Sequence, residues 1–119
     1  MNKYSFNNGY GTIYNFDIVE KIPAGMQVWN IGENMKNDNL IPFCFTVPAT
    51  YEIIPENLKA VYLPIIDAQI LRRAAGRGIC DIKSAKKFIK RGPGENTNKK
   101  ITYNLAVAAL PILTNIMED

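Results

Sequence analysis

The side chains of this chain that are best suited to chemistry are cations, and they gather in one stretch. Residues 72–100 hold ten Lys and Arg against two acids, a net charge of +8. Residues 1–64 hold four bases and six acids, a net charge of −2, so the overall charge of +3 hides two halves of opposite sign. Clustered cations raise the local concentration of phosphates and gain entropy by releasing counterions. The charge distribution therefore predicts an anionic partner.

Four lysines of this stretch recur at intervals of three and four residues, which places them on one face of a helix. Like charges at this spacing destabilise an isolated helix by a few tenths of a kcal/mol per pair, and only Asp81 is close enough to relieve them. A solvated helix face usually carries both signs, so this one is unusual. The residues predicted to contact nucleic acid are Arg72, Arg73, Arg77, Lys83, Lys86, Lys87, Lys90 and Arg91.

Aromatic residues do not strengthen the prediction of nucleic-acid binding. Most lie in the first half, and only Phe88 and Tyr103 fall in the second. A platform that stacks single strands needs aromatics interleaved with cations. We therefore expect contacts mainly with backbone phosphates and little dependence on sequence.

Two other interpretations of the basic stretch remain open. It suits a protein-interaction module, an accessory or inhibitory protein that docks on a larger acidic partner. It also suits a solubility surface, or a cover for acidic strands of the same domain. Neither the oligomeric state nor the identity of a partner follows from the residues.

Catalytic chemistry is poorly represented. The chain has no histidine, which excludes Ser-His and Cys-His nucleophiles and removes the commonest metal ligand. The segment 33–43 is rich in Asn and Asp but lacks the central glycine and the closing glutamate of a calcium loop. We expect no enzyme, no catalytic residue, no metal and no cofactor. A site built on Cys44, a tyrosine or a carboxylate is a remote third alternative.

The glycine-rich runs 76–78 and 92–94 are best explained as helix ends. Neither matches a nucleotide-binding fingerprint, and neither follows a predicted strand. A helix-turn-helix with Gly78 in its turn would place Ser84 and Lys87 at buried apolar positions. With Gly76 in the turn, Arg72 would take the place of a small residue. A standard DNA-reading helix is therefore not expected.

The first half has the pattern of a sheet. Residues 10–22 alternate with the period of two that is typical of a half-buried strand. The turn signals Pro23 and Gly25 precede a return strand at 26–31, and together these predict a hairpin. Further strands are expected at 40–47 and at 59–63, with a possible extended piece at 51–54. Pro42 cannot donate to a ladder, so the first of these strands should lie at a sheet edge or begin just after Pro42.

The second half changes to helical periodicity. A first helix should start at residue 65 with an apolar stripe that includes Ile66, and a second should follow Asp81 as its N-cap. A third should run from a cap at Thr97 or Asn98 to about residue 117. It is apolar on two sides, so we expect it between the sheet and the other helices. Pro111 predicts a kink or a division into two helices.

Strands followed by helices predict an α+β fold, in which an N-terminal, mostly antiparallel sheet of about four strands packs against three C-terminal helices. The length suits a single domain, residues 1–119, strand-rich over 1–64 and helical over 65–119. Cys44 and Cys80 lack a paired spacing and are expected to be buried. No apolar run is long enough to cross a bilayer and no signal peptide is evident, so we expect a cytoplasmic protein without a membrane partner.

Overall fold

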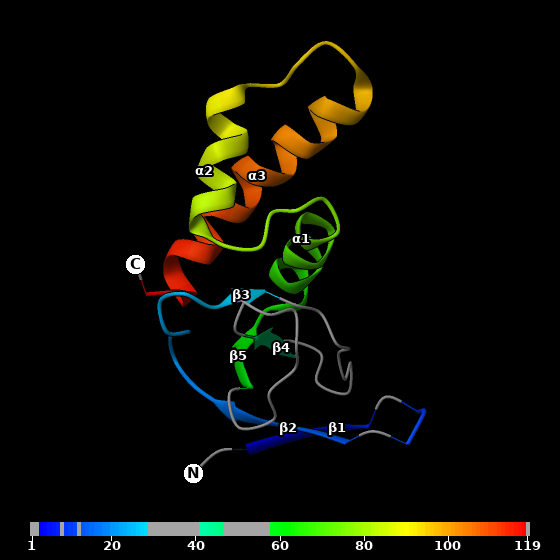
Figure 1. Ribbon diagram of the computed structural model, residues 1–119, viewed down its shortest axis with the longest axis vertical. Helices are drawn as coiled ribbons and strands as arrows, with labels where there is room; N and C mark the ends of the chain where they lie inside the picture. The colour runs from blue at the N-terminus through cyan, green and yellow to red at the C-terminus, as the bar shows by residue number, and fades with distance from the viewer. Residues whose placement is uncertain (1–2, 8, 12, 29–40, 47–57, 119) are drawn as a thin grey trace.

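The chain folds as an α+β protein, as the sequence predicts. The computed structural model describes residues 3–7, 9–11, 13–28, 41–46 and 58–118, with residues 41–46 described by their backbone (Figure 1). In this part of the chain, five strands precede three helices. The strands are β1 (Lys3–Asn7), β2 (Ile13–Ile18), β3 (Gln27–Val28), β4 (Ile41–Thr46) and β5 (Lys59–Leu63), and the helices are α1 (Ile65–Ala75), α2 (Ile82–Arg91) and α3 (Thr97–Ile116).

The strands form one mixed sheet in the order β1-β2-β5-β4-β3. The β1–β2, β5–β4 and β4–β3 pairs are antiparallel, and β2 pairs with β5 in parallel. The backbone amide of Asp17 donates to the carbonyl of Leu58 at 3.0 Å, and that of Val19 to the carbonyl of Ala60 at 2.9 Å. The expected mostly antiparallel character therefore holds for three of the four pairs.

The hairpin predicted between residues 10–22 and 26–31 is wrong. β2 pairs with β1 on one side, while β3 pairs with β4 at the opposite edge of the sheet. Between them the chain leaves the sheet at Ile22, which is completely buried and bridges to Met117 beside the end of α3. The turn itself forms, since the amide of Met26 reaches the carbonyl of Pro23 at 3.4 Å. A turn signal alone did not specify which strands pair.

Strand β1 was not predicted, although its signals are visible in retrospect. It forms the hairpin with β2 across a connection that contains Gly9 and Gly11, both at positive φ (83° and 91°). Tyr4 packs against Phe16 with ring centroids 6.0 Å apart, and Phe16 is fully buried. The predicted inward parity of β2 is thus confirmed from residue 13 onward, whereas Tyr10 lies before the strand and is exposed.

The strands expected at 40–47 and 59–63 are confirmed as β4 and β5. The edge position expected for Pro42 is wrong, because β4 lies between β5 and β3. Within the described residues, β3 pairs only with Phe45 and Thr46, so its ladder does not reach Pro42. The proposed extended piece at 51–54 and nearly all of the segment compared with a calcium loop lie outside the described residues.

Helix α1 buries Ala68, Leu71 and Ala74, which recur every three residues. Ile66, expected in the buried stripe, is 71% exposed. The reason is helix geometry: at about 100° per residue, Ile66 falls on nearly the opposite side of α1 from the buried face.

Helix α3 is continuous from Thr97 to Ile116, and Asn96 caps it in place of the expected Thr97 or Asn98. Pro111 lies inside the helix without dividing it. Proline removes the hydrogen bond to the carbonyl of Val107, and Val107 lies on the exposed side of the helix (46% exposed).

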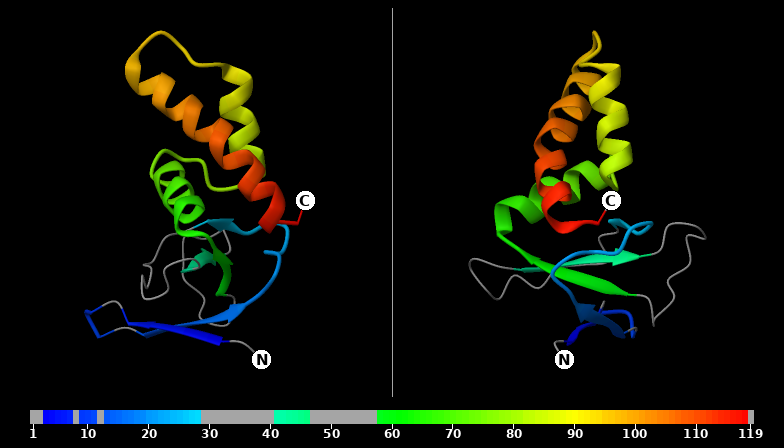
Figure 2. Two further views of the ribbon diagram at one scale, coloured as in Figure 1. Left: turned by 180° about the vertical axis from the view of Figure 1, so that it is seen from behind. Right: turned by 90° about the vertical axis from the view of Figure 1, so that its left-hand side faces the viewer.

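Helices α2 and α3 form an antiparallel pair that extends away from the sheet, while α1 lies between this pair and the sheet (Figures 1 and 2). The molecule is accordingly elongated, with dimensions of 44 × 30 × 27 Å. α3 packs against α1 and α2, and its C-terminal end meets the sheet half at Ile22. The expected position of α3 between the sheet and the other helices is therefore found at that end, while α1 lies between the rest of the helix pair and the sheet (Figures 1 and 2).

Candidate nucleic-acid interface

Helix α2 presents five cations on its outer face. Each residue turns an α-helix by about 100°, so Lys83, Lys86, Lys87 and Lys90 fall within an arc of roughly 100°, and Arg91 extends it by about 40°. All five side chains are exposed. We call these five residues the α2 basic face.

The opposite face of α2 fixes this orientation. Ala85 is completely buried, and the partly buried Ile82, Phe88 and Ile89 pack against the core that α1 and α3 share. Because the apolar stripe on one side of this short helix is buried, the cations on the other side face solvent.

Asp81 is the N-cap of α2, and its carboxylate is hydrogen-bonded there. Its carboxylate accepts from the backbone amide of Ser84 at 2.7 Å, while the hydroxyl of Ser84 accepts from the amide of Asp81 at 3.1 Å. The side-chain amide of Gln27 donates to the same carboxylate at 3.2 Å. Burial raises the pKa of Asp81, but these hydrogen bonds outweigh it and hold the pKa below its ordinary value of 3.8. The predicted N-cap is confirmed, and the carboxylate is committed to the backbone and Gln27.

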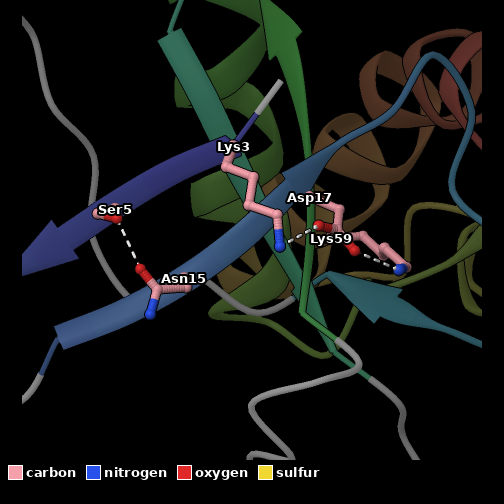
Figure 3. Close-up of polar contacts among 5 residues, drawn as sticks. All are labelled: Lys3, Ser5, Asn15, Asp17 and Lys59. Atoms are coloured by element: carbon pink, nitrogen blue, oxygen red, sulfur yellow. Dashed lines mark hydrogen bonds and ion pairs between the residues drawn. The ribbon is translucent and has the colours of Figure 1, made fainter. Parts of the chain in front are cut away.

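None of the five cations of the α2 basic face forms an ion pair with a carboxylate of the described residues, although the charge of Lys83 contributes to the lowered pKa of Asp81. Within that part of the chain, the ion pairs are Lys3–Asp17 at 3.6 Å and Lys59–Asp17 at 3.0 Å, both on the sheet (Figure 3). Lys59, by hydrogen bond and charge, and then Lys3 hold the pKa of Asp17 below its ordinary range. Asp17 is therefore paired with lysines of its own sheet and not with the α2 basic face.

Arg91 closes the α2 basic face at the end of the helix. Its guanidinium carbon lies 5.3 Å from the centre of the Phe88 ring, within the range of a cation–π contact. The contact holds the charged group over the last turn of α2 while leaving it exposed.

Arg77 makes hydrogen bonds within the fold. One guanidinium nitrogen, Nη1, donates to Asn98 Oδ1 at 2.6 Å, to Thr102 Oγ1 at 3.1 Å and to the carbonyl of Asn98 at 3.3 Å. The residue is half-buried. It fastens the α1–α2 connection to the first turns of α3, apart from the α2 basic face, and its predicted phosphate contact stays a prediction.

Arg72 and Arg73 are exposed in the last turn of α1, away from the α2 basic face. Figure 1 shows α1 and α2 on different sides of α3, and both helices pack against it. The structure thus brings together five of the eight predicted residues and separates the other three.

Lys99 was counted in the basic stretch but not among the candidate residues. It lies in the first turn of α3 and, with Arg91, lines a cavity between the far ends of α2 and α3. Phe88 and Tyr103 line the same cavity. The four residues come from two helices and are far apart in sequence, so the sequence did not show that they line one cavity.

Other chemistry receives no support from the geometry. Burial, and then the charge of Asp81, raise the pKa of the half-buried Cys80 thiol, which disfavours the reactive thiolate. The side chain of Cys44 lies outside the described part. Among the residues described, no three Cys, Asp or Glu side chains gather as a metal site, and no helix has both the length and the hydropathy to cross a membrane.

Comparison of this chain with known protein families, with curated proteins and with solved structures finds no match.

Proposed function

We propose that this protein binds nucleic acid non-catalytically, through contacts of the α2 basic face with backbone phosphates. The observation that supports the proposal is the set of five exposed cations on one helix face, none of which forms an ion pair within the described residues. Cations held without an internal partner cost the helix stability, and an external polyanion compensates that cost.

The dimensions of the face suit a few phosphates. Lys83 and Lys90 are seven residues apart, which corresponds to about 10 Å along the helix. Successive phosphates of one strand rise by about 3.4 Å, so this length matches about three of them. Flexible lysine side chains contact phosphate as point charges, which favours binding that depends little on base sequence.

Salt dependence gives the sharpest test. If all five cations replace counterions on a single strand, the logarithm of the binding constant should fall with the logarithm of salt concentration with a slope near −3.5, about −0.7 per contact. Between about 50 and 200 mM salt, affinity should then fall on the order of a hundredfold. Labelled single-stranded and duplex DNA and RNA can be titrated by fluorescence anisotropy.

Two variants separate charge from the rest of the structure. Replacing Lys83, Lys86, Lys87 and Lys90 by Gln should make the single-strand slope shallower by about 2.8. Replacing the same four by Arg keeps the charge and should keep the slope. Absence of binding to any nucleic acid at low salt, or an unchanged slope in the Gln variant, would refute the proposal. The first result would leave an acidic protein as the anionic partner.

A further inference from the structure

We infer that the cavity between the far ends of α2 and α3 takes one unpaired nucleotide, with its base against Phe88 and Tyr103 and its phosphate beside Arg91 and Lys99. This inference rests on the proposed function and adds to it a preference for single strands. We call this cavity the tip cavity.

The location of the tip cavity makes it accessible. α2 ends and α3 begins at the pole of the molecule farthest from the sheet (Figures 1 and 2). The cavity measures about 510 Å³, within the range of small-ligand sites, which is roughly 300–1,000 Å³. That volume suits one nucleotide better than a stack of several. The lining includes Phe88, Arg91, Gly94, Lys99, Thr102 and Tyr103.

The chemistry of the lining fits a base and a phosphate together. Phe88 and Tyr103 are the two aromatic residues of the helical half, and the fold brings them from separate helices to the same cavity. Both residues are partly exposed, and the Arg91 guanidinium lies over the Phe88 ring, so a cation is already beside the aromatic surface that a base would contact. Base stacking on aromatic side chains tolerates any base, and cations beside the ring add to it.

Charge distinguishes the tip cavity from two other cavities of the described residues. A cavity of about 450 Å³ near the start of α2 is lined by Lys83 and Lys86 but also by the carboxylates of Asp81 and Glu118. One of about 480 Å³ beside Pro111 is lined by Asp67 and by no cation. The tip cavity is lined by two cations and no carboxylate. It is thus the one of the three suited to an anionic group.

The walls of the tip cavity are held in place by the hydrogen bonds of Arg77 and by the close approach of Gly94 to Lys99. Arg77 ties Asn98 and Thr102, both lining residues, to the α1–α2 connection. Gly94 has a positive φ of 70°, and a Cβ built on it would lie 2.9 Å from Lys99 Cβ and Cδ. The missing side chain lets the turn lie directly against the stem of Lys99. A cavity held in its binding shape loses less entropy when a ligand enters.

The experiment compares two probes of equal charge. One is a thymidine oligomer of about a dozen nucleotides; the other is an abasic oligomer with the same number of phosphates. Wild-type protein should bind the thymidine oligomer roughly fivefold to a hundredfold more tightly, the range expected for stacking one base. Tyr103→Leu and Phe88→Leu should each remove most of this difference and leave the salt slope unchanged. Tyr62→Leu, which removes an exposed aromatic on β5, should keep it.

The outcomes separate the two proposals. Equal binding of both oligomers with a steep salt slope would overturn the tip cavity inference and leave the α2 basic face intact. Binding of neither oligomer, and of no duplex DNA or RNA, at low salt would refute the proposed function. The inference then depends on amide chemical shifts of Gly94 and Lys99 in titrations with thymidine monophosphate and with inorganic phosphate. Larger shifts with the nucleotide support it, and equal or absent shifts overturn it.

Discussion

At the scale of single residues, similar side chains in this protein serve different ends. Lys87 extends into solvent without a partner among the described residues, whereas Arg77 donates three hydrogen bonds from one nitrogen and is half-buried. Charge counting in the sequence treats both residues alike, so it could not show that Arg77 contacts α3 while Lys87 faces solvent.

Asp81 is the residue on which the start of α2 depends most. Asp81→Ala removes the acceptor for the Ser84 amide and the contact with Gln27, and should lower the free energy of unfolding by about 1–2 kcal/mol. Asp81→Asn keeps a cap acceptor and should cost less. Urea unfolding followed by circular dichroism measures both. Equal losses in the two variants would show that charge, not capping, is what matters.

The lowered pKa values of Asp17 and Asp81 predict acid sensitivity. Because each folded pKa lies below the ordinary value of 3.8, the unfolded chain binds protons first as pH falls. The stabilisation from these carboxylates is complete above pH 3.8 and is lost as pH falls through the lower folded values. Unfolding free energies measured from pH 6 downward should decline in this window, and less steeply in Asp81→Asn. A flat profile would contradict the prediction.

At the scale of elements, the α2 basic face favours binding of an anion but lowers the stability of the helix that carries it. The four lysines form like-charge pairs at three- and four-residue spacing, each destabilising by about 0.2–0.5 kcal/mol. Their replacement by Gln should therefore stabilise the protein by about 1 kcal/mol at low salt while it weakens nucleic-acid binding. Added salt should stabilise wild type more than the variant, as measured by urea unfolding. A variant less stable than wild type would show that the lysine stems contribute packing.

How much the sequence could predict also differs between elements. The cap at Asp81, the grouping of four lysines and the bounds of β5 depend on neighbours within a few residues, and these predictions were correct. The pairing of β2 and the convergence of Phe88 with Tyr103 depend on residues far apart in the chain. No local periodicity carries that information, so the hairpin was wrong and the tip cavity went unseen.

At the scale of the whole molecule, two hydrogen bonds join the end of the chain to the sheet half. The amide of Ile22 donates to the carbonyl of Ile116 at 2.7 Å, and the amide of Glu118 donates to the carbonyl of Ile22 at 2.8 Å. Because Ile22 is completely buried, water cannot easily replace a lost partner. This bridge holds the helical pair in position relative to the strands.

Glu118→Pro should break one of these bonds selectively. Met117, at φ −119° and ψ 143°, already has the extended backbone that a residue before proline requires. The variant removes only the amide donor, and the unpaired buried carbonyl should cost about 1–3 kcal/mol. Glu118→Ala keeps the amide and should be nearly neutral in thermal unfolding. Similar losses in both variants would place the effect in the glutamate side chain.

The parallel pairing of β2 with β5 has a consequence for how the chain folds. Asp17 and Lys59 are 42 residues apart in sequence, and Ile22 meets Met117 across most of the chain. Helices α2 and α3, in contrast, are adjacent elements joined by a short turn. Contacts between distant residues form slowly because closing a long loop costs entropy. We therefore expect the two helices of a refolding chain to associate early, so that the cationic helix pair forms before β2 pairs with β5.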